Sequence, residues 1–518
     1  MSSHAPKNIF LLRPQYVLPL EHFSGAYSTP PLGLAYLVGV LRKQGHQVTP
    51  LDAVGEDLNR FHEFKRNKTR LSVIGLTDEE ILNRVPKDSE IIGISLMFSN
   101  EWIHHKHLVR KICKKFPKTK VVLGGEHATA EYERILNECP DIYACALGEG
   151  EETLLDIASG TAREEVAGIA YQEDSQVKVN PRRPRINNIS EISWPDWQGI
   201  PLESYLEKKL GYNSPQGKRA VPMLASRGCP YQCTFCSNNL MWTTRWVPRD
   251  IEDLISEIKF NFNNYQMEHI DFHDLTAIVN KEWILNFSKR LQEESLPITW
   301  SMPAGTRSEA LTKEVLESVF KSGCKRMTYA PESGSEETLK RMKKRVNLDK
   351  MKQSIKQALK VGFNVKVHMI MGSPRQTKAE VLESFIFLFK MAFIGVHDAS
   401  CFAYSPYPGT EDFNYLKEKG IIKVDDEYDE ILANNVYNSF KNIRSWSEDI
   451  PKELLIFTTL GGSAFFYFFQ FLFRPHRIFI VFYRIFTNKC FTTFELALSS
   501  FLFGFMRTRK KAIQEHAS

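Results

Sequence analysis

The stretch SRGCPYQCTFCSNN (residues 226–239) places Cys229, Cys233 and Cys236 within eight residues. Three thiolates at this spacing can hold a zinc ion or an iron–sulfur cluster. Structural zinc needs four ligands, and neither a second CxxC nor a nearby pair of histidines follows Cys236. A four-iron cluster held by three cysteines instead leaves one iron without a protein ligand. We therefore favour a cluster and keep a zinc knuckle as the alternative.

The cysteine stretch directly follows the first of six short apolar runs between residues 216 and 440. Helical stretches separate the runs, a pattern that predicts a partial or full barrel of parallel strands. Such barrels carry their reactive groups at the carboxyl ends of the strands, where the cysteines lie. The runs are VPMLAS (221–226), EHIDFHD (268–274), ITWSMP (298–303), RMTYAPE (326–332), NVKVHMIMG (364–372) and DASCFAYSP (398–406).

A separate α/β domain is predicted over residues 1–160. Apolar runs alternate with helical patterns there, which indicates a doubly wound parallel sheet with ligands at its strand ends. Residues 55–88 are expected to be mostly irregular, and 161–215 to form a hairpin and linker. Beyond the barrel, residues 441–518 are rich in aromatic side chains and are predicted to form a helical extension. The runs in the first domain are NIFLLRP (8–14), HQVTPLDA (46–53), EIIGISLMF (90–98) and KVVLGGEHA (120–128).

A family resemblance rests on the cysteine motif. CxxxCxxC with Phe235 before the last cysteine, directly after the first strand of a barrel, resembles the radical S-adenosylmethionine (SAM) enzymes. The resemblance implies a [4Fe-4S] cluster on Cys229, Cys233 and Cys236, with SAM on the open iron. Reductive cleavage of SAM in that family gives a 5′-deoxyadenosyl radical that abstracts hydrogen.

The same resemblance suggests where SAM is bound. Glu332 and Ser333, after the fourth strand, are candidate SAM-binding residues, and Glu332 could instead be a carboxylate at a helix N-terminus. Asp271 and Asp274, with His273 between them, follow the second strand and are pocket candidates. Arg307, after the third strand, is placed toward the SAM carboxylate, or else caps a helix.

A second resemblance covers the first domain. Four segments match, in order, the cobalamin-binding domain fused to one branch of radical SAM enzymes. Gly124, Gly125, Gly148 and Gly150 would let the backbone approach the planar cofactor. His127 is a candidate contact, expected to be a loop residue touching the corrin or its tail. The segments are TPPLGLAYLVGVLRKQGHQVTPLDA (29–53), GISLMF (93–98), VVLGGEHAT (121–129) and ALGEGEETL (146–154).

One feature departs from the methionine synthase type of cobalamin domain. That type carries DxHxxG, whose histidine binds cobalt, whereas no histidine closely follows Asp52 in DAVGEDL (52–58). We therefore do not expect a protein histidine to ligate cobalt in that manner.

Composition constrains the cellular location of the protein and the class of partner it binds. A net charge of +6 over 518 residues is too dilute to indicate nucleic-acid binding. Nine cysteines and a start that lacks an apolar signal run predict a reducing, cytoplasmic location.

The C-terminal extension leaves three interpretations open. Residues 454–473 carry no charge, and basic residues outnumber acidic ones between 471 and 518. The segment could be a helical cap on the barrel, a peripheral membrane contact through residues 454–511, or a membrane-spanning helix.

The predicted function is that of a cobalamin-dependent radical SAM enzyme that methylates an unactivated carbon of a small-molecule or lipid-like substrate. It would need an external electron donor of the flavodoxin or ferredoxin type. Two alternatives remain: a non-methylating oxidative cyclase or ring-forming enzyme acting on a porphyrin or lipid, and a non-catalytic regulator that binds cobalamin or metal.

Overall fold

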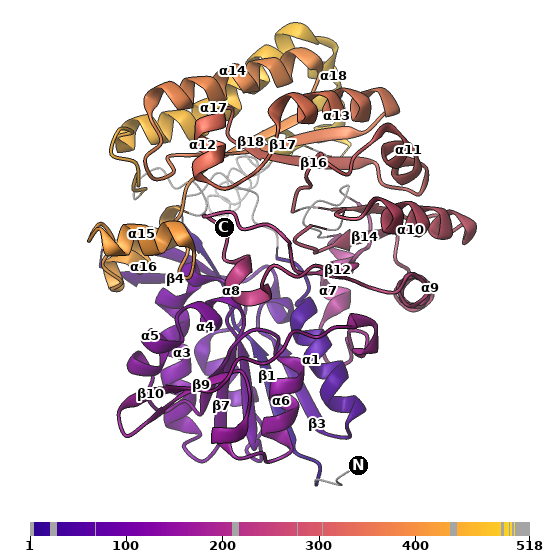
Figure 1. Cartoon of the computed structure of the whole chain (residues 1–518). Coiled ribbons are helices and arrows are strands. Elements are labelled where there is room, and N and C mark those ends of the chain that lie inside the picture. Colours follow the sequence, from indigo (N-terminus) through magenta and orange to yellow (C-terminus); the bar gives the residue numbers. More distant parts are fainter. Residues whose placement is uncertain are drawn as a thin grey trace, which may run out of the picture.

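The computed structural model describes residues 5–20, 28–67, 69–209, 217–276, 278–302, 304–435, 443–487, 490, 492–496, 498–499 and 502. Two α/β units lie one above the other, with the N-terminal unit at the bottom of Figure 1 and the C-terminal helices at the top. The fold is mixed α/β, as predicted.

The N-terminal unit is built on a seven-stranded sheet with the order β10-β9-β8-β7-β6-β1-β3. Five strands are parallel, and β9 and β10 add an antiparallel edge. The hairpin within the predicted 161–215 linker is therefore part of the first sheet, which extends beyond residue 160 to Val179. The strands are β1 (Asn8–Arg13), β3 (Gln47–Asp52), β6 (Ile91–Ser95), β7 (Lys120–Gly124), β8 (Ala144–Ala146), β9 (Ile169–Glu173) and β10 (Gln176–Val179).

Helices cover both faces of this sheet because its strands are apolar on both sides. Ile9 and Leu11 pack on the side of α1 and α6, whereas Phe10 and Leu12 pack on the side of α3 and α5. The chain leaves β1 toward β3 on one side and returns to β6 on the other, so the carboxyl ends of β1 and β6 flank the topological switch point. The helices are α1 (Leu32–Lys43), α3 (Trp102–Lys115), α4 (Glu126–Ala130), α5 (Tyr132–Glu138) and α6 (Glu151–Ala158).

The described residues between 55 and 88 include regular structure, contrary to the mostly irregular stretch we predicted. They contain β4 (Phe61–Arg66), β5 (Thr69–Ile74) and α2 (Asp78–Arg84), and β2 (Tyr16–Pro19) completes an antiparallel sheet of order β2-β5-β4. Charged side chains obscure the pattern because β4 has one exposed face, so its strand signal is an alternation rather than an apolar run.

The second unit contains the six strands where the sequence predicts them. They form two three-stranded parallel sheets, β11-β14-β15 and β16-β17-β18, connected by parallel bridges from Trp300 to Cys324 and from Thr306 to Tyr329. The strands are β11 (Ala220–Met223), β14 (His269–Phe272), β15 (Thr299–Ser301), β16 (Arg326–Glu332), β17 (Asn364–Met371) and β18 (Asp398–Ala403). The flanking helices are α9 (Ile251–Tyr265), α10 (Lys281–Glu293), α11 (Lys313–Lys321), α12 (Glu336–Arg341), α13 (Leu348–Val361) and α14 (Lys378–Ile394).

Short elements connect the two units and fasten them together. The connecting elements are α7 (Leu202–Glu207), β12 (Ser226–Arg227), α8 (Asn238–Trp242) and β13 (Val247–Pro248). The 3-10 turns lie at Gly55–Asp57, Ser99–Glu101 and Arg163–Glu165 in the N-terminal unit and at Ile189–Glu191 in the connection. After the barrel, α15 (Glu411–Glu418) and α16 (Asp426–Asn435) return to the N-terminal unit. There Asp429 of α16 accepts hydrogen bonds from Lys106 and Arg134.

The C-terminal helices α17 (Lys452–Phe473) and α18 (His476–Phe486) pack on the outside of the barrel. A Cβ at Gly462 would lie 2.9 Å from the Cys401 sulfur on β18, so α17 comes close to the sheet there. Helix α17 is long and apolar enough to cross a membrane by length and composition, although one of its sides is buried in the protein. Residues 503–511 of the predicted 454–511 membrane contact lie outside the described residues.

Candidate active site between the two units

The three cysteines lie in a loop between β12 and α8, at the level where the barrel meets the N-terminal unit. All three are free and partly exposed. Burial raises the pKa of each thiol, to about 12 for Cys236, so metal binding would have to displace the protons.

The cysteine loop is fixed by hydrogen bonds to its backbone. The Asn238 amide donates to the carbonyl of Cys229 at 3.1 Å and so connects the two ends of the loop. Asp274 accepts from the backbone N–H of Ala225 at 3.0 Å and from the Ser226 hydroxyl at 2.5 Å. Both oxygens of this predicted pocket residue are therefore directed at the strand that leads into the cysteines.

The chemistry of the donor set suits a cluster. Among the residues that the structure describes, no three His, Cys, Asp or Glu side chains are grouped closely enough to hold a single metal ion. A four-iron cluster makes a different demand, because each thiolate binds its own iron. The partly exposed thiols also adjoin a cavity of about 550 Å³ that Cys233 and Cys236 help to line.

Arg307 and Glu332 lie beside the cysteine loop. The Arg307 guanidinium lies 3.6 Å over the ring of Tyr231, inside the cysteine motif, and donates to the carbonyls of Lys344 and Arg345. Its Nη1 is buried with no hydrogen-bond partner. The guanidinium thus retains a donor for a further acceptor.

The backbone turns sharply at Glu332. Glu332 has a φ of +67° and accepts a hydrogen bond from Lys344 at 2.8 Å. The next residue, Ser333, is buried, its hydroxyl bonding Ser384 and the backbone N–H of Ser335. Glu332 therefore faces the site, whereas Ser333 shapes the turn.

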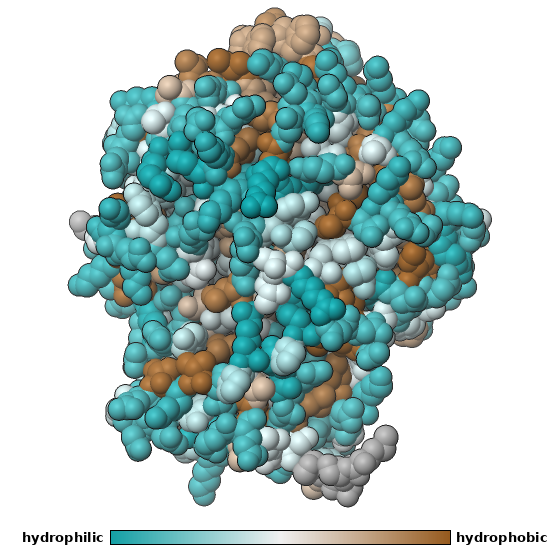
Figure 2. Space-filling model, viewed as in Figure 1, coloured by the Kyte–Doolittle hydropathy of each residue, from teal (hydrophilic) through white to brown (hydrophobic). Residues whose placement is uncertain are grey.

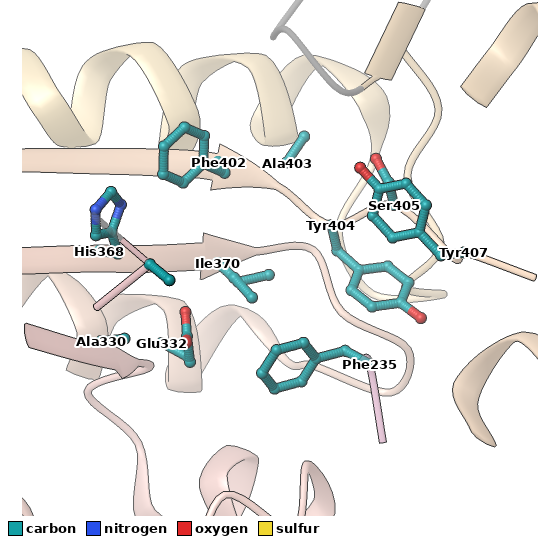
Figure 3. Close-up of a pocket in the computed structure, with 11 residues that line it drawn as sticks. Phe235, Ala330, Glu332, His368, Ile370, Phe402, Ala403, Tyr404, Ser405 and Tyr407 are labelled. Carbon is teal, nitrogen blue, oxygen red and sulfur yellow. The ribbon is translucent and has the colours of Figure 1, made fainter. Parts of the chain in front are cut away.

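A cavity of about 290 Å³ opens inside the barrel next to Glu332. Figure 3 shows Glu332 from β16, His368 from β17 and Phe235 from the cysteine motif around it. Most of the other lining is apolar or aromatic, which suits a flat ring system. The remaining lining residues are Ala304, Ala330, Ile370, Phe402, Ala403, Tyr404, Ser405 and Tyr407.

Asp271 and His273 lie at the end of β14. The Asp271 carboxylate accepts from the Ser301 hydroxyl at 3.2 Å and is 3.6 Å from Nε2 of His273. Nε2 of His273 is buried without a hydrogen-bond partner. His273 lines a second cavity, which lies between the two units.

This interdomain cavity has a volume of about 440 Å³ and lies over the carboxyl ends of β1 and β6. The four predicted glycines, Gly124, Gly125, Gly148 and Gly150, all line it. Gly125 has a φ of +108°, and a Cβ there would lie 2.5 Å from the carbonyl oxygen of Leu96. A side chain at this position would therefore displace the Leu96 backbone, which leads directly into Met97 and Phe98 of the cavity lining.

His127 is not among the residues that line this cavity. It lies in α4 rather than in a loop, so that part of the expectation was wrong. Burial lowers the pKa of His127 to about 3, and its Nδ1 is 2.9 Å from the Ser99 hydroxyl. His127 is therefore buried within the N-terminal unit and does not contact the cavity.

The strand end at Asp52 does not line the cavity either. Asp52 is fully buried and accepts a hydrogen bond from Tyr205 of α7 at 2.6 Å. The cavity opens instead at the end of β1, beside Arg13 and Gln15. Within the described part of the chain, the residues of the N-terminal unit that line it include no histidine.

Sequence reasoning missed the ion pairs that connect the cysteine loop to the cavity. Arg227, two residues before Cys229, donates to Glu149 at 3.1 Å and to Glu151 at 2.7 Å. On the other side of the cysteines, Ser237 donates to Glu126. The acidic residues within GGEHAT and GEGEETL were the available signal, but we explained those segments by their glycines alone.

Comparison with known proteins is consistent with this geometry. Models of the radical SAM superfamily and of the B12 binding domain match residues 223–388 and 24–158. An uncharacterized methyltransferase of Pyrococcus horikoshii is 30% identical over 392 residues, which cover 74% of this chain and 78% of that protein. The chain belongs to the radical SAM superfamily. Membership with a B12 binding domain implies a [4Fe-4S] cluster, SAM and cobalamin as its cofactors.

Further known proteins align with most of this chain. Cytidylyl-2-hydroxyethylphosphonate methyltransferase of Streptomyces wedmorensis is 29% identical, over 76% of this chain and 79% of that protein. The solved structure of the radical SAM methyltransferase TsrM from Kitasatospora setae aligns with a TM-score of 0.61 at 14% identity, covering 80% of this chain and 76% of that one. The structure of the cobalamin-dependent SAM radical enzyme OxsB aligns with a TM-score of 0.60 at 19% identity. The alignment covers 85% of this chain and 58% of that one. At these identities the structures support the fold.

Proposed function

We propose that this protein is a cobalamin-dependent radical SAM methyltransferase that adds a methyl group to a carbon of a small-molecule substrate. The names of its relatives from Pyrococcus and Streptomyces support methyl transfer. A lipid-like substrate remains part of the proposal, since the lining of the barrel cavity is largely apolar.

The observation that carries the proposal is the double attachment of the cysteine loop. Arg227 on one side and Ser237 on the other bind acidic residues of the two glycine segments that line the interdomain cavity. The three cysteines are thereby held next to the cavity assigned to cobalamin. Methyl transfer between two cofactors requires this proximity, because the reacting atoms must come within van der Waals distance.

Residues of the barrel would hold SAM against the cluster. Arg307 offers a free donor to a carboxylate, and Glu332 offers an acceptor beside the mouth of the barrel cavity. We assign Asp271 a supporting role through His273, and assign Asp274 and Ser333 to positioning, because their polar atoms are already bonded within the protein.

The interdomain cavity would hold part of the cobalamin. Its glycine floor admits a flat macrocycle, and the unpartnered Oε1 of Gln15 and Nε2 of His273 are available to polar groups of a ligand. When bound, cobalamin supplies a methyl-carrying metal, and the cluster with SAM supplies a radical. The protein contributes position and the exclusion of water.

The remaining expectations also belong to the proposal. An external donor of the flavodoxin or ferredoxin type would reduce the cluster. A reducing, cytoplasmic location also belongs to the proposal, on the cysteine content of the sequence.

Anaerobic reconstitution with iron, sulfide, cobalamin and SAM tests the proposal. With a reductant and extract of the source cell, the product should gain one methylene unit in mass and 5′-deoxyadenosine should form. Cys233→Ala should abolish both, whereas Cys113→Ala, at a lone thiol in α3, should abolish neither. Loss of hydrogen or gain of oxygen in the product would favour the cyclase alternative. Protein that never cleaves SAM would favour the regulator.

A further inference from the structure

Three helices at the end of the molecule away from the first sheet have an open apolar outer face. Figure 1 places α14, α17 and α18 together there, and Figure 2 shows tan and brown side chains gathered at the same end. On α14, Leu382, Ile386, Phe389 and Phe393 are exposed. Their spacing of four, three and four residues puts them in one stripe along the helix.

The stripe continues onto α17. Phe457, Phe468 and Leu472 are each more than 60% exposed. Half-buried rings join the two helices: the ring centroids of Phe389 and Phe469 are 4.9 Å apart. The two stripes therefore form one continuous surface.

Helix α18 extends this surface. Phe479 is 77% and Phe486 is 73% exposed, and Phe482 lies between them on the exposed side. Of the residues in this helix, only Val481 and Ile485 are buried. We call the exposed apolar side chains of α14, α17 and α18 the aromatic face.

The inner side of α17 is committed to the barrel. Tyr467 donates to Asp398 at 2.6 Å, and Gln470 donates to the carbonyl of His397 at 2.9 Å. Surrounding α17 with lipid would break these bonds and expose a buried carboxylate to hydrocarbon, which is costly. Only the outer side of the helix is free to meet an apolar phase, so α17 would lie on a membrane rather than cross it.

Two of the basic residues that suggested a membrane contact have another role. Arg474 donates to the carbonyl of Ala392, and Arg477 to that of Gly395, so both cap the C-terminal end of α14. They fix the relative position of the helices. The charge available to lipid head groups must therefore come from elsewhere.

The sequence from 507 to 518 supplies that charge. It holds Arg507, Arg509, Lys510 and Lys511 against a single acidic residue, Glu515. A segment of this composition is too polar to cover the aromatic face but is attracted to anionic head groups. A chain that carries both an exposed apolar surface and a basic segment has the combination that binds an anionic bilayer.

We propose that the aromatic face docks this enzyme onto the surface of a bilayer that contains anionic lipid. The phenylalanines would enter the boundary between head groups and acyl chains, with the N-terminal unit directed away from the membrane. The inference rests on the exposed helices and does not depend on the reaction catalysed.

Flotation of the full-length, cobalamin-bound protein with vesicles tests the proposal. The vesicles are phosphatidylcholine alone and phosphatidylcholine with about one quarter phosphatidylglycerol. We expect binding to the anionic vesicles, weakened by added salt. Phe479→Ser combined with Phe486→Ser should lower the partition coefficient about tenfold or more, because two large apolar side chains no longer insert.

The matched control is Phe61→Ser, at a phenylalanine of β4 that is 63% exposed on the N-terminal unit. It should bind vesicles as the wild type does, and all variants should retain cobalamin and the same melting temperature. Failure of the wild type to float with either vesicle, or equal losses in Phe61→Ser, would overturn the proposal. A different pair of results would also overturn it: no vesicle binding, together with a dimer in sedimentation that Phe479→Ser combined with Phe486→Ser abolishes. A second copy of the chain would then occupy the aromatic face.

Discussion

Individual side chains around the cysteines divide into those with a free polar atom and those already satisfied. Arg307 retains an unpartnered Nη1, and Glu332 faces a cavity. Asp274 and Ser333 use their polar atoms to hold neighbouring backbone. This difference separates residues that can contact SAM from residues that position the loop, which spacing in the sequence could not do.

The role of Arg307 can be tested by Arg307→Lys. Lysine keeps the charge but loses the planar fork that stacks on Tyr231 and reaches two carbonyls at once. We expect the Kd for SAM to rise about 10- to 100-fold with unchanged iron content, since a charged hydrogen bond contributes roughly 1.5–3 kcal/mol. Equilibrium dialysis under anaerobic conditions measures this. Unchanged affinity would remove Arg307 from the SAM site.

Asp274 predicts a pH dependence of stability. Burial raises the pKa of this carboxyl to about 6, above its ordinary value of 3.8. The folded state thus binds a proton more tightly than the unfolded state, and stability falls as pH rises from about 4 to about 6. Asp274→Asn should remove this slope, on the order of 2 kcal/mol over the window.

Urea unfolding of both proteins at several pH values measures the difference. The wild type and the variant should diverge most at the low end of the window, where the wild type gains stability that the variant lacks. Parallel pH profiles would contradict a raised pKa at Asp274.

At the scale of elements, the sequence predicted the strands that recur as apolar runs. It missed the structure that depends on which strands or units pair with each other. All six barrel strands and the parallel sheet of the first unit follow from apolar runs, because strands buried on both faces are apolar throughout. The antiparallel sheet of β2, β4 and β5 was missed since β4 is half exposed and charged. The site shows the same division: the cysteines follow from spacing, whereas the pairing of Arg227 with Glu149 required the docked units.

The turn between β7 and α4 should tolerate no side chain at its second glycine. Gly125→Ala would combine a positive φ with a contact of 2.5 Å to the Leu96 carbonyl. Gly45→Ala has a similar φ of +87° but nothing within 4 Å, so it isolates the conformational cost of about 1–2 kcal/mol.

We expect Gly125→Ala to lose more stability than Gly45→Ala and to lose cobalamin affinity, which Gly45→Ala should keep. Thermal unfolding and titration with hydroxocobalamin measure the two effects. Equal effects of the two substitutions would mean that the close approach at Gly125 is unimportant.

In the whole molecule, two groups of buried ion pairs are among the contacts that hold the units together. One is the pairing of Arg227 with Glu149 and Glu151 beside the cysteines, and the other is Asp429 of α16 between Lys106 and Arg134. Breaking either group leaves part of the charge paired, because Glu149 also pairs with Arg185 and Lys106 also pairs with Asp426. The cost should therefore be smaller than the roughly 3–5 kcal/mol expected for an isolated buried pair. Arg227 is two residues from Cys229, whereas Asp429 is far from all three cysteines in the sequence. Removal of the two contacts should therefore affect catalysis differently.

Arg227→Met should uncouple SAM cleavage from methylation of the substrate. SAM cleavage should persist, but methylated product per 5′-deoxyadenosine should fall about tenfold or more, because small displacements of reacting groups are costly. Asp429→Asn is the control, with similar destabilisation and an unchanged ratio. Chromatographic quantification of methylated product and 5′-deoxyadenosine in one reaction measures this ratio. A lower ratio in both variants would contradict a specific role of Arg227 and indicate that any loss of interdomain contact has the same effect.

The central claim is that three cysteines hold a cluster whose open iron binds SAM. Electron paramagnetic resonance of anaerobically reconstituted, reduced protein tests it most directly. The account predicts a [4Fe-4S] signal that changes when SAM is added and is absent in the Cys229→Ala, Cys233→Ala and Cys236→Ala variants. A signal that does not respond to SAM, or iron that remains bound in all three variants, would contradict it.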